Sequence, residues 1–110
     1  MSADYPKRVA QLSSLRQRRP TIVDVDGKKI VLVRLGEEVC AITNECPHAG
    51  GQLGQGYVQN GAIECPIHLA AFDLHTGGAV RNPAIVAQTY HVVVDGDDIL
   101  LLDNPASPPL

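Results

Sequence analysis

Short apolar runs, separated by turn-forming residues, characterise the sequence over most of its length. Residues 22–25 and 30–33 are mostly apolar and β-branched, and Asp26-Gly27 lies between them. Asp-Gly between such runs is a strong hairpin signal. A second turn at Gly36-Glu37 leads into the apolar residues 39–43. The pattern therefore predicts an antiparallel meander of three strands.

Two more hairpins are predicted in the second half of the chain. They pair residues 57–59 with 62–64 across Asn60-Gly61, and residues 88–94 with 99–102 across residues 95–97. Near the N-terminus we expect a short strand over residues 7–12 and a capped helical turn over Ser13–Gln17, stopped by Pro20. No crossover helix that could join parallel strands is predicted, so the expected fold class is all-β with antiparallel pairing.

Length and composition favour one small globular unit. The chain has 110 residues, of which 45% are hydrophobic and 19% charged. We expect a single domain, residues 1–110, with no separate catalytic domain and with an extended or disordered tail over residues 104–110. No apolar run approaches the roughly 20 residues of a membrane helix, and no signal-peptide pattern opens the chain. No membrane association is expected.

The charges are unevenly distributed along the chain. Eight of the nine lysines and arginines precede Leu35, whereas nine of the twelve acidic residues follow it, and the net charge is -3. The acidic side chains of the second half either lie on solvated strand faces or form a docking surface for a partner. Nucleic-acid binding is disfavoured, because the chain is acidic and its basic residues lack interleaved aromatics.

Two short motifs hold most of the metal-binding side chains. Cys46-Pro47-His48 and Cys65-Pro66-Ile67-His68 are separated by sixteen residues. Such a set of donors is compatible with either a single zinc ion or a 2Fe-2S cluster. Zinc fingers usually keep like ligands together, whereas here each motif supplies one thiol and one imidazole, which favours the cluster. With both cysteines used as ligands, Cys40 has no disulfide partner, and a reducing cytoplasm is the expected location.

The runs CPHAGGQLGQG and IECPIHLAAFDLHTGG, followed by Asn82-Pro83, resemble the Rieske family over residues 40–83. The resemblance implies that Cys46 and Cys65 ligate one iron of a Rieske-type 2Fe-2S cluster and that His48 and His68 ligate the other. It also implies a small antiparallel sandwich or barrel, into which a cluster-binding subdomain of two loops is inserted at about residues 44–84.

Within the family, the sequence is most similar to ferredoxins of ring-hydroxylating oxygenase systems. This implies a monomeric one-electron carrier between a flavoprotein NAD(P)H reductase and a terminal Rieske non-haem iron oxygenase. The small subunit of an assimilatory nitrite reductase is the alternative, and a zinc-stabilised interaction module is a more distant one. No cluster of nucleophilic or acid-base residues is present, and a fully ligated cluster has no open coordination position, so the chain is not expected to be an enzyme.

High-potential members of the family also resemble this chain, but they carry a disulfide between the loops and two hydroxyls that hydrogen-bond to the sulfurs. Gly51 and Ile67 stand here in place of the two cysteines, Ala70 in place of the serine and Phe72 in place of the tyrosine. The resemblance therefore implies a potential at the low end of the family range.

Other residues near the motifs are given supporting roles. Four glycines, Gly50, Gly51, Gly54 and Gly56, are expected to allow positive φ and to direct backbone N–H groups at sulfur. Leu53 and Leu69 are expected to exclude water, and Phe72 to pack between the cluster loops and the flanking sandwich. Three residues are expected not to be ligands: Cys40 in the core, and His75 and His91 at the surface.

Overall fold

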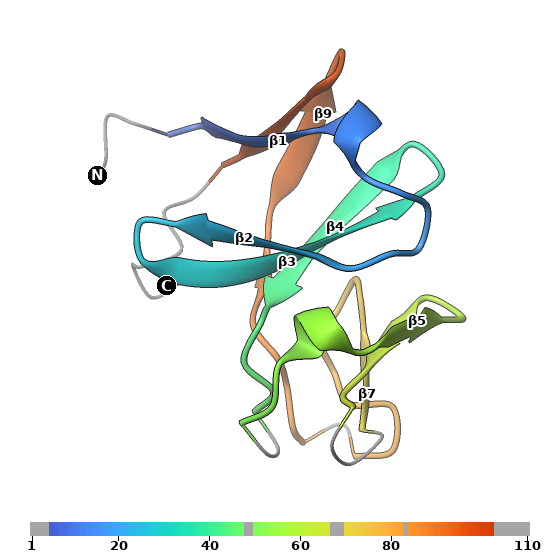
Figure 1. The fold of residues 1–110 in the computed structure, drawn as a ribbon. Helices are drawn as coiled ribbons and strands as arrows, with labels where there is room; N and C mark the ends of the chain where they lie inside the picture. Colours follow the sequence, from blue (N-terminus) through green and yellow to red (C-terminus); the bar gives the residue numbers. More distant parts are fainter. Residues whose placement is uncertain (1–4, 48–49, 67–69, 83, 103–110) are drawn as a thin grey trace.

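The computed structural model describes residues 5–47, 50–66, 70–82 and 84–102. In this part of the chain, all helical structure is 3-10, in two short segments, η1 (Leu12–Ser14) and η2 (Leu53–Gln55). The other elements are strands, arranged in antiparallel sheets (Figure 1). Their bounds are β1 Lys7–Gln11, β2 Thr21–Val25, β3 Lys28–Leu35, β4 Glu38–Thr43, β5 Tyr57–Gln59, β6 Ala62–Glu64, β7 Ala71–Asp73, β8 Thr89–Tyr90, β9 Val92–Asp95 and β10 Asp98–Leu101. The predicted all-β fold class is confirmed.

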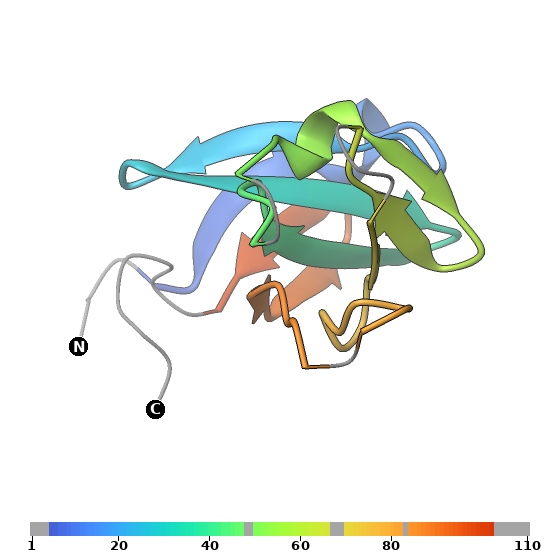
Figure 2. The same cartoon turned by 90° about the horizontal axis from the view of Figure 1, so that it is seen from below.

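The strands form a central sheet in the order β2-β3-β4-β8, an outer sheet β1-β10-β9 and a small sheet β5-β6-β7. Figure 2 looks at the molecule from the end that carries the small sheet, with the strands of the outer sheet on the other side of the central sheet. None of the helices in the described residues is long and apolar enough to cross a membrane.

The central sheet is buried on both faces. Along β3, Val31 and Val33 belong to a core shared with the small sheet, whereas Ile30 and Leu32 belong to a second core shared with the outer sheet. Side chains of a strand alternate between its faces, so a strand between two cores needs apolar residues at consecutive positions. This requirement explains the unbroken run Ile30–Val33, and it makes the central sheet the platform on which the small sheet rests.

The predicted hairpin turns are confirmed in position and geometry. Asp26 and Gly27 have φ values of 52° and 84°, and Asn60 and Gly61 have 53° and 74°. Positive φ at both central residues is typical of the type I′ turn, which matches the twist of the flanking strands. The turns join β2 to β3 and β5 to β6, and the second hairpin lies between the two cysteine motifs in the sequence.

Two predicted elements need correction. The helical turn expected over Ser13–Gln17 lies instead at Leu12–Ser14, without a side-chain cap; the backbone N and Oγ of Ser13 both donate to the Asp97 carboxylate, at 2.8 and 2.7 Å. The strand expected over residues 88–94 is divided at His91, because β8 pairs with β4 while β9 pairs with β10. The chain leaves the central sheet for the outer sheet there. The expected tail over residues 104–110 lies outside the described residues.

Candidate metal centre

Cys46 and Cys65 begin two loops that close in the same way. The Cys46 N–H donates to the Gly51 carbonyl at 2.8 Å, and the Cys65 N–H donates to the Ala70 carbonyl at 2.7 Å. Each bond spans five residues along the chain. We call residues 46–51 the first cysteine loop and residues 65–70 the second; their described parts lie at the same end of the molecule (Figures 1 and 2).

The two thiols are inaccessible to solvent. Cys46 is 1% exposed and Cys65 is 0% exposed, and both belong to the core shared with the small sheet. They form no disulfide. Of the predicted ligands, the structure therefore brings these two cysteines into one apolar cluster. His48 and His68, like Ile67, Leu69 and Pro83, lie outside the described residues.

The second cysteine loop continues the hairpin formed by β6 and β7. Ile63 pairs with Phe72 and Glu64 pairs with Ala71, and the bond from Cys65 to Ala70 follows as the next step of this ladder. The register of the strands thus places the start of the loop. Phe72 is fully buried in the same core as the two cysteines, as expected for a residue between loop and sandwich.

Asn44 anchors the first cysteine loop. It is 5% exposed, its Oδ1 accepts from the Gly54 N–H at 2.9 Å, and its carbonyl accepts from the Leu53 N–H at 2.7 Å. Its own N–H donates to the Lys29 carbonyl in β3 at 3.2 Å. One buried amide therefore ties both ends of the loop region to the central sheet. The sequence analysis gave Asn44 no role; a polar residue directly after an apolar strand was the available signal.

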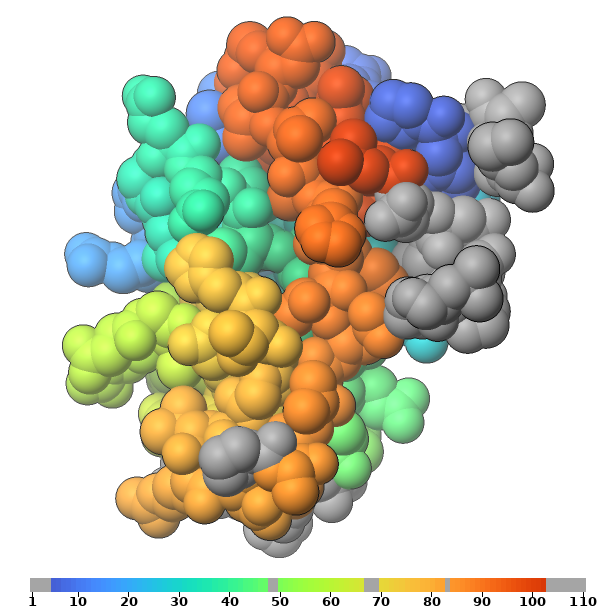
Figure 3. Space-filling view, turned by 180° about the vertical axis from the view of Figure 1, so that it is seen from behind, coloured from blue at the N-terminus to red at the C-terminus, as the bar shows by residue number. Residues whose placement is uncertain are grey.

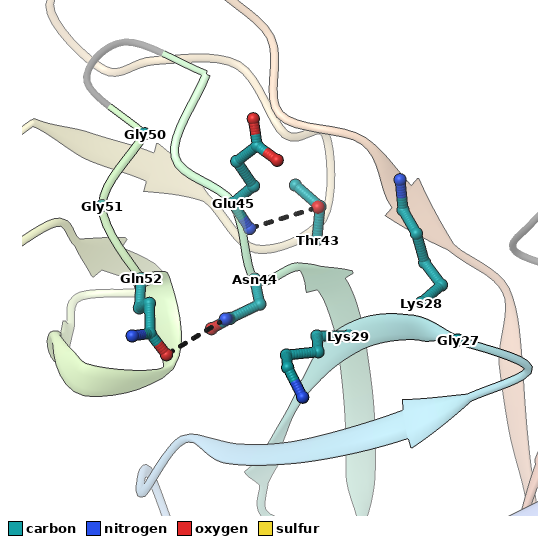
Figure 4. A pocket seen from close by; sticks show the side chains of 9 residues that line it. All are labelled: Gly27, Lys28, Lys29, Thr43, Asn44, Glu45, Gly50, Gly51 and Gln52. Atoms are coloured by element: carbon teal, nitrogen blue, oxygen red, sulfur yellow. Dashed lines mark hydrogen bonds between the residues drawn. The ribbon is translucent and has the colours of Figure 1, made fainter.

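A polar cleft of about 450 Å³ lies beside this anchor, between the β2–β3 turn and the first cysteine loop. Figure 4 shows the side chains that line it, with the Asn44 amide directed at Gln52. Of the two lysines that line the cleft, Lys29 pairs with Asp24 at 3.5 Å.

The expectation that glycine N–H groups point at sulfur is wrong for three of the four glycines, and the expectation of positive φ is confirmed for one. The N–H groups of Gly50, Gly54 and Gly56 donate to oxygens of Cys46, Asn44 and Leu53, not to sulfur. Of the four, only Gly50 has positive φ, at 72°. Gly54 and Gly56 are required for another reason: a Cβ at Gly54 would collide with the Ile22 side chain, and one at Gly56 with the backbone oxygen of Glu64. Leu53 is fully buried, in agreement with its expected role.

The residues expected not to be ligands lie as predicted. Cys40 is buried in the core, and His75 and His91 are exposed. Burial, followed by the nearby carboxylates of Glu38 and Asp73, raises the pKa of Cys40 to about 11, so this thiol stays protonated at neutral pH. A hydrogen bond to Glu38 raises the pKa of His75. The sequence analysis missed the proximity of these side chains, because Cys40 and His75 are 35 positions apart.

The protein is thus a small β-protein whose two cysteine loops close in the same way. Comparisons with known proteins show the family to which it belongs. The model of the Rieske [2Fe-2S] domain matches residues 6–99. The ferredoxin subunit of 3-phenylpropionate/cinnamic acid dioxygenase from Escherichia coli (strain K12) is 40% identical over 82 residues, 73% of this chain and 76% of that protein. The chain belongs to the Rieske [2Fe-2S] family.

Solved structures agree with this assignment. The ferredoxin of carbazole 1,9a-dioxygenase from Nocardioides aromaticivorans IC177 has a TM-score of 0.83 and 41% identity, covering 88% of this chain and 96% of that one. A protein from Mycobacterium tuberculosis described as the small subunit of an NADH-dependent nitrite reductase has a TM-score of 0.81 but 24% identity, covering 88% and 93%. The second likeness concerns the fold alone.

The donor set fits the cluster that characterises the family. Rieske clusters need two thiolates for one iron and two imidazoles for the other. Cys46 and Cys65 are buried and unbridged, and each loop also contains one histidine in its sequence. A buried, largely apolar surrounding with few solvent contacts suits a cluster whose potential depends on its environment.

Proposed function

We propose that the protein is a one-electron carrier with one Rieske-type 2Fe-2S cluster, and that it passes electrons from a flavoprotein NAD(P)H reductase to a terminal oxygenase. The observation that carries the proposal is the pair of cysteine loops of equal span, each with a buried thiol and a histidine in its sequence. The relatives described as ferredoxin components of dioxygenases support the choice of partner. The protein itself transforms no substrate.

In this proposal Cys46 and Cys65 hold one iron, and His48 and His68 hold the other. When bound, the cluster supplies a site that accepts and releases one electron. The residues of this chain fix its place: the β6–β7 register positions Cys65, and Asn44 anchors the loop that carries Cys46. Residues 44–84 are the cluster-binding subdomain within a single domain of residues 1–110.

The role of a fixed nitrite reductase subunit is the second candidate. It is favoured only by similarity of fold, at 24% identity, whereas the ferredoxin of the carbazole system reaches 41% over a similar share of this chain. A carrier that serves two partners in turn is best suited as a monomer, and its unpaired cysteines suit a cytoplasmic location. Copurification with a large partner at fixed stoichiometry would favour the subunit over the carrier. Membership of a 2Fe-2S family disfavours the zinc module.

Replacing either proposed histidine ligand is expected to change the cluster. His48→Cys and His68→Cys should each abolish the Rieske-type EPR and visible absorption spectra, because a thiolate donates more charge to iron than an imidazole does. EPR of the reduced proteins checks this. His91→Gln, at an exposed position, is the matched control and should retain the wild-type spectrum. An unaltered EPR spectrum in either cysteine variant would contradict the ligand assignment.

Electron transfer to the oxygenase is expected to slow as salt is added. The charged side chains of residues 44–84 are Glu45, Glu64, Asp73 and Arg81, so this part of the surface has an acidic excess. Exposed charges steer encounter, and salt screens them over about 8 Å at physiological ionic strength. Stopped-flow oxidation of the reduced carrier at limiting concentration measures the rate. A rate independent of ionic strength would assign docking to apolar contacts instead.

A further inference from the structure

Three metal-binding side chains outside the two cysteine loops meet at the edge of the core, the buried Cys40 and the exposed Glu38 and His75. Glu38 and Cys40 are two positions apart in β4 and therefore face the same side of the central sheet. His75 comes from the turn after β7, in the part of the chain that forms the small sheet. Figure 3 shows the turquoise surface around the β3–β4 turn next to the gold surface of the segment that follows β7.

The ligand atoms already have nearly the spacing of a tetrahedral site. One carboxylate oxygen of Glu38, the Cys40 Sγ and one ring nitrogen of His75 all lie within 4.8 Å of one another. The His75 Nε2 is 2.9 Å from the Glu38 Oε1 and 3.8 Å from the Cys40 Sγ. Tetrahedral zinc with ordinary bond lengths would separate the same atom pairs by about 3.3 and 3.5 Å. These two distances need to change by only a few tenths of an ångström, and the third pair, the Glu38 oxygen and the Cys40 Sγ, lies within 4.8 Å.

The backbone that presents His75 is held firmly. The Asp73 Oδ1 accepts from the N–H groups of His75 and Thr76, at 2.8 and 2.9 Å, and the Asp73 carbonyl accepts from Gly77 at 2.8 Å. Cys40 is fixed by its strand and is only 7% exposed. Two of the three donors are therefore placed before any ion arrives, which lowers the entropic cost of binding.

Charge and donor type favour a divalent transition metal ion. The carboxylates of Glu38 and Asp73 make the surroundings of the Cys40 sulfur negative, and this potential attracts a cation. Thiolate and imidazole donors select zinc-like ions over magnesium and calcium, which prefer oxygen ligands. The alternative is an exposed Glu38–His75 ion pair without an ion, which contributes little to stability.

We propose that Glu38, Cys40 and His75 form a second metal site, which binds one Zn²⁺ through three protein ligands and leaves the fourth position to water. Binding releases the thiol proton of Cys40 and the proton that His75 Nε2 shares with Glu38 to solvent, leaves the ring proton of His75 on Nδ1, and forms Zn–S, Zn–N and Zn–O bonds. The ion would join the central sheet to the turn that follows the small sheet. The site shares no residue with the proposed cluster ligands.

Equilibrium dialysis of the cluster-loaded protein against ZnCl₂, with zinc and iron measured together, tests the site. One zinc per chain is expected, with the iron content unchanged. His75→Gln and Glu38→Gln should each weaken zinc binding at least about tenfold. Both side chains are exposed, so these variants should fold. His91→Gln and Glu37→Gln, exposed positions elsewhere and beside the site, are the matched controls and should bind zinc as the wild type does.

Zinc K-edge absorption spectroscopy of the protein with one equivalent of Zn²⁺ identifies the ligands without interference from iron. One sulfur scatterer at about 2.3 Å and nitrogen or oxygen scatterers at about 2.0–2.1 Å are expected. Cys40→Ser should remove the sulfur scatterer. Wild-type affinity in both His75→Gln and Glu38→Gln, or a spectrum of the wild type without sulfur, would overturn the proposal.

Discussion

Gly56→Ala is expected to lower the melting temperature of the protein by at least about 10 °C and to reduce its iron content. The Cβ of alanine would overlap the carbonyl oxygen of Glu64 in β6. The Cβ is fixed by the backbone of residue 56 and the oxygen belongs to the backbone of Glu64, so no change of side-chain rotamer can relieve the collision. Overpacking of this kind costs about 3 kcal/mol or more, equivalent to several degrees of melting temperature per kcal/mol.

The position of the collision makes the consequence functional as well as structural. Gly56 follows η2, which the buried Asn44 ties to the first cysteine loop, and Glu64 directly precedes Cys65. Separating these two backbones would move the cysteine loops apart. Backbone strain is not involved, because φ at Gly56 is -90°, a value open to any residue.

Gly61→Ala is the matched control for this experiment. Gly61 lies in the turn between β5 and β6 with φ of 74°, and a Cβ there meets nothing within 4 Å. Gly61→Ala should lower the free energy of unfolding only by the strain of an alanine in the left-handed conformation, about 1–2 kcal/mol. Circular dichroism melting of both variants, with iron analysis, separates the two effects. Equal melting temperatures for the two variants would show that the approach of Gly56 to Glu64 is not tight.

Local sequence patterns were sufficient to predict those elements whose structure is decided by a single turn or a single apolar run. Asp26-Gly27 and Asn60-Gly61 predicted their hairpins, because few residue pairs tolerate two consecutive positive φ values. The resemblance carried by the two cysteine motifs likewise implied two loops. These signals depend on neighbours in the chain and need no knowledge of the tertiary structure.

Features that depend on tertiary contacts could not be predicted from the sequence alone. No glycine or proline within residues 88–94 marks a break at His91, yet the chain changes sheets there, because Thr89 pairs with Ile42 whereas Val92 pairs with Leu101. The 3-10 segment at Leu12–Ser14 is likewise positioned by a distant carboxylate, that of Asp97. Periodicity cannot identify Ile42 or Asp97 as partners, since each lies more than forty residues from the segment that it contacts.

The glycine prediction failed for a similar reason. A glycine beside metal ligands can be required by positive φ, by an N–H directed at sulfur or by a close approach of two backbones, and the sequence alone does not separate these causes. Gly50 proved to need positive φ, and Gly56 the close approach. An N–H directed at sulfur was expected for both, and both N–H groups donate to carbonyl oxygens instead.

The midpoint potential of the cluster-loaded protein is expected near -150 mV, at the low end of a family range that extends to about +300 mV. Phe72 is fully buried in the core that contains Cys46 and Cys65, and Ala70 packs against the same core. Neither side chain can donate a hydrogen bond. Without such donors the more negative reduced cluster is less stabilised, so the potential stays low. Potentiometric titration followed by EPR measures it.

Adding hydroxyls at these two positions is expected to raise the potential. Ala70→Ser and Phe72→Tyr each introduce an O–H group, and a donor that favours the reduced cluster by about 1.4 kcal/mol raises a one-electron potential by about 60 mV. Ala71→Ser is the matched control, because Ala71 precedes the buried Phe72 in β7 and neighbouring strand residues face opposite sides; its potential should equal that of the wild type. A wild-type midpoint above about +100 mV would contradict both the tuning by absent donors and the proposed carrier between a reduced flavin and an oxygenase.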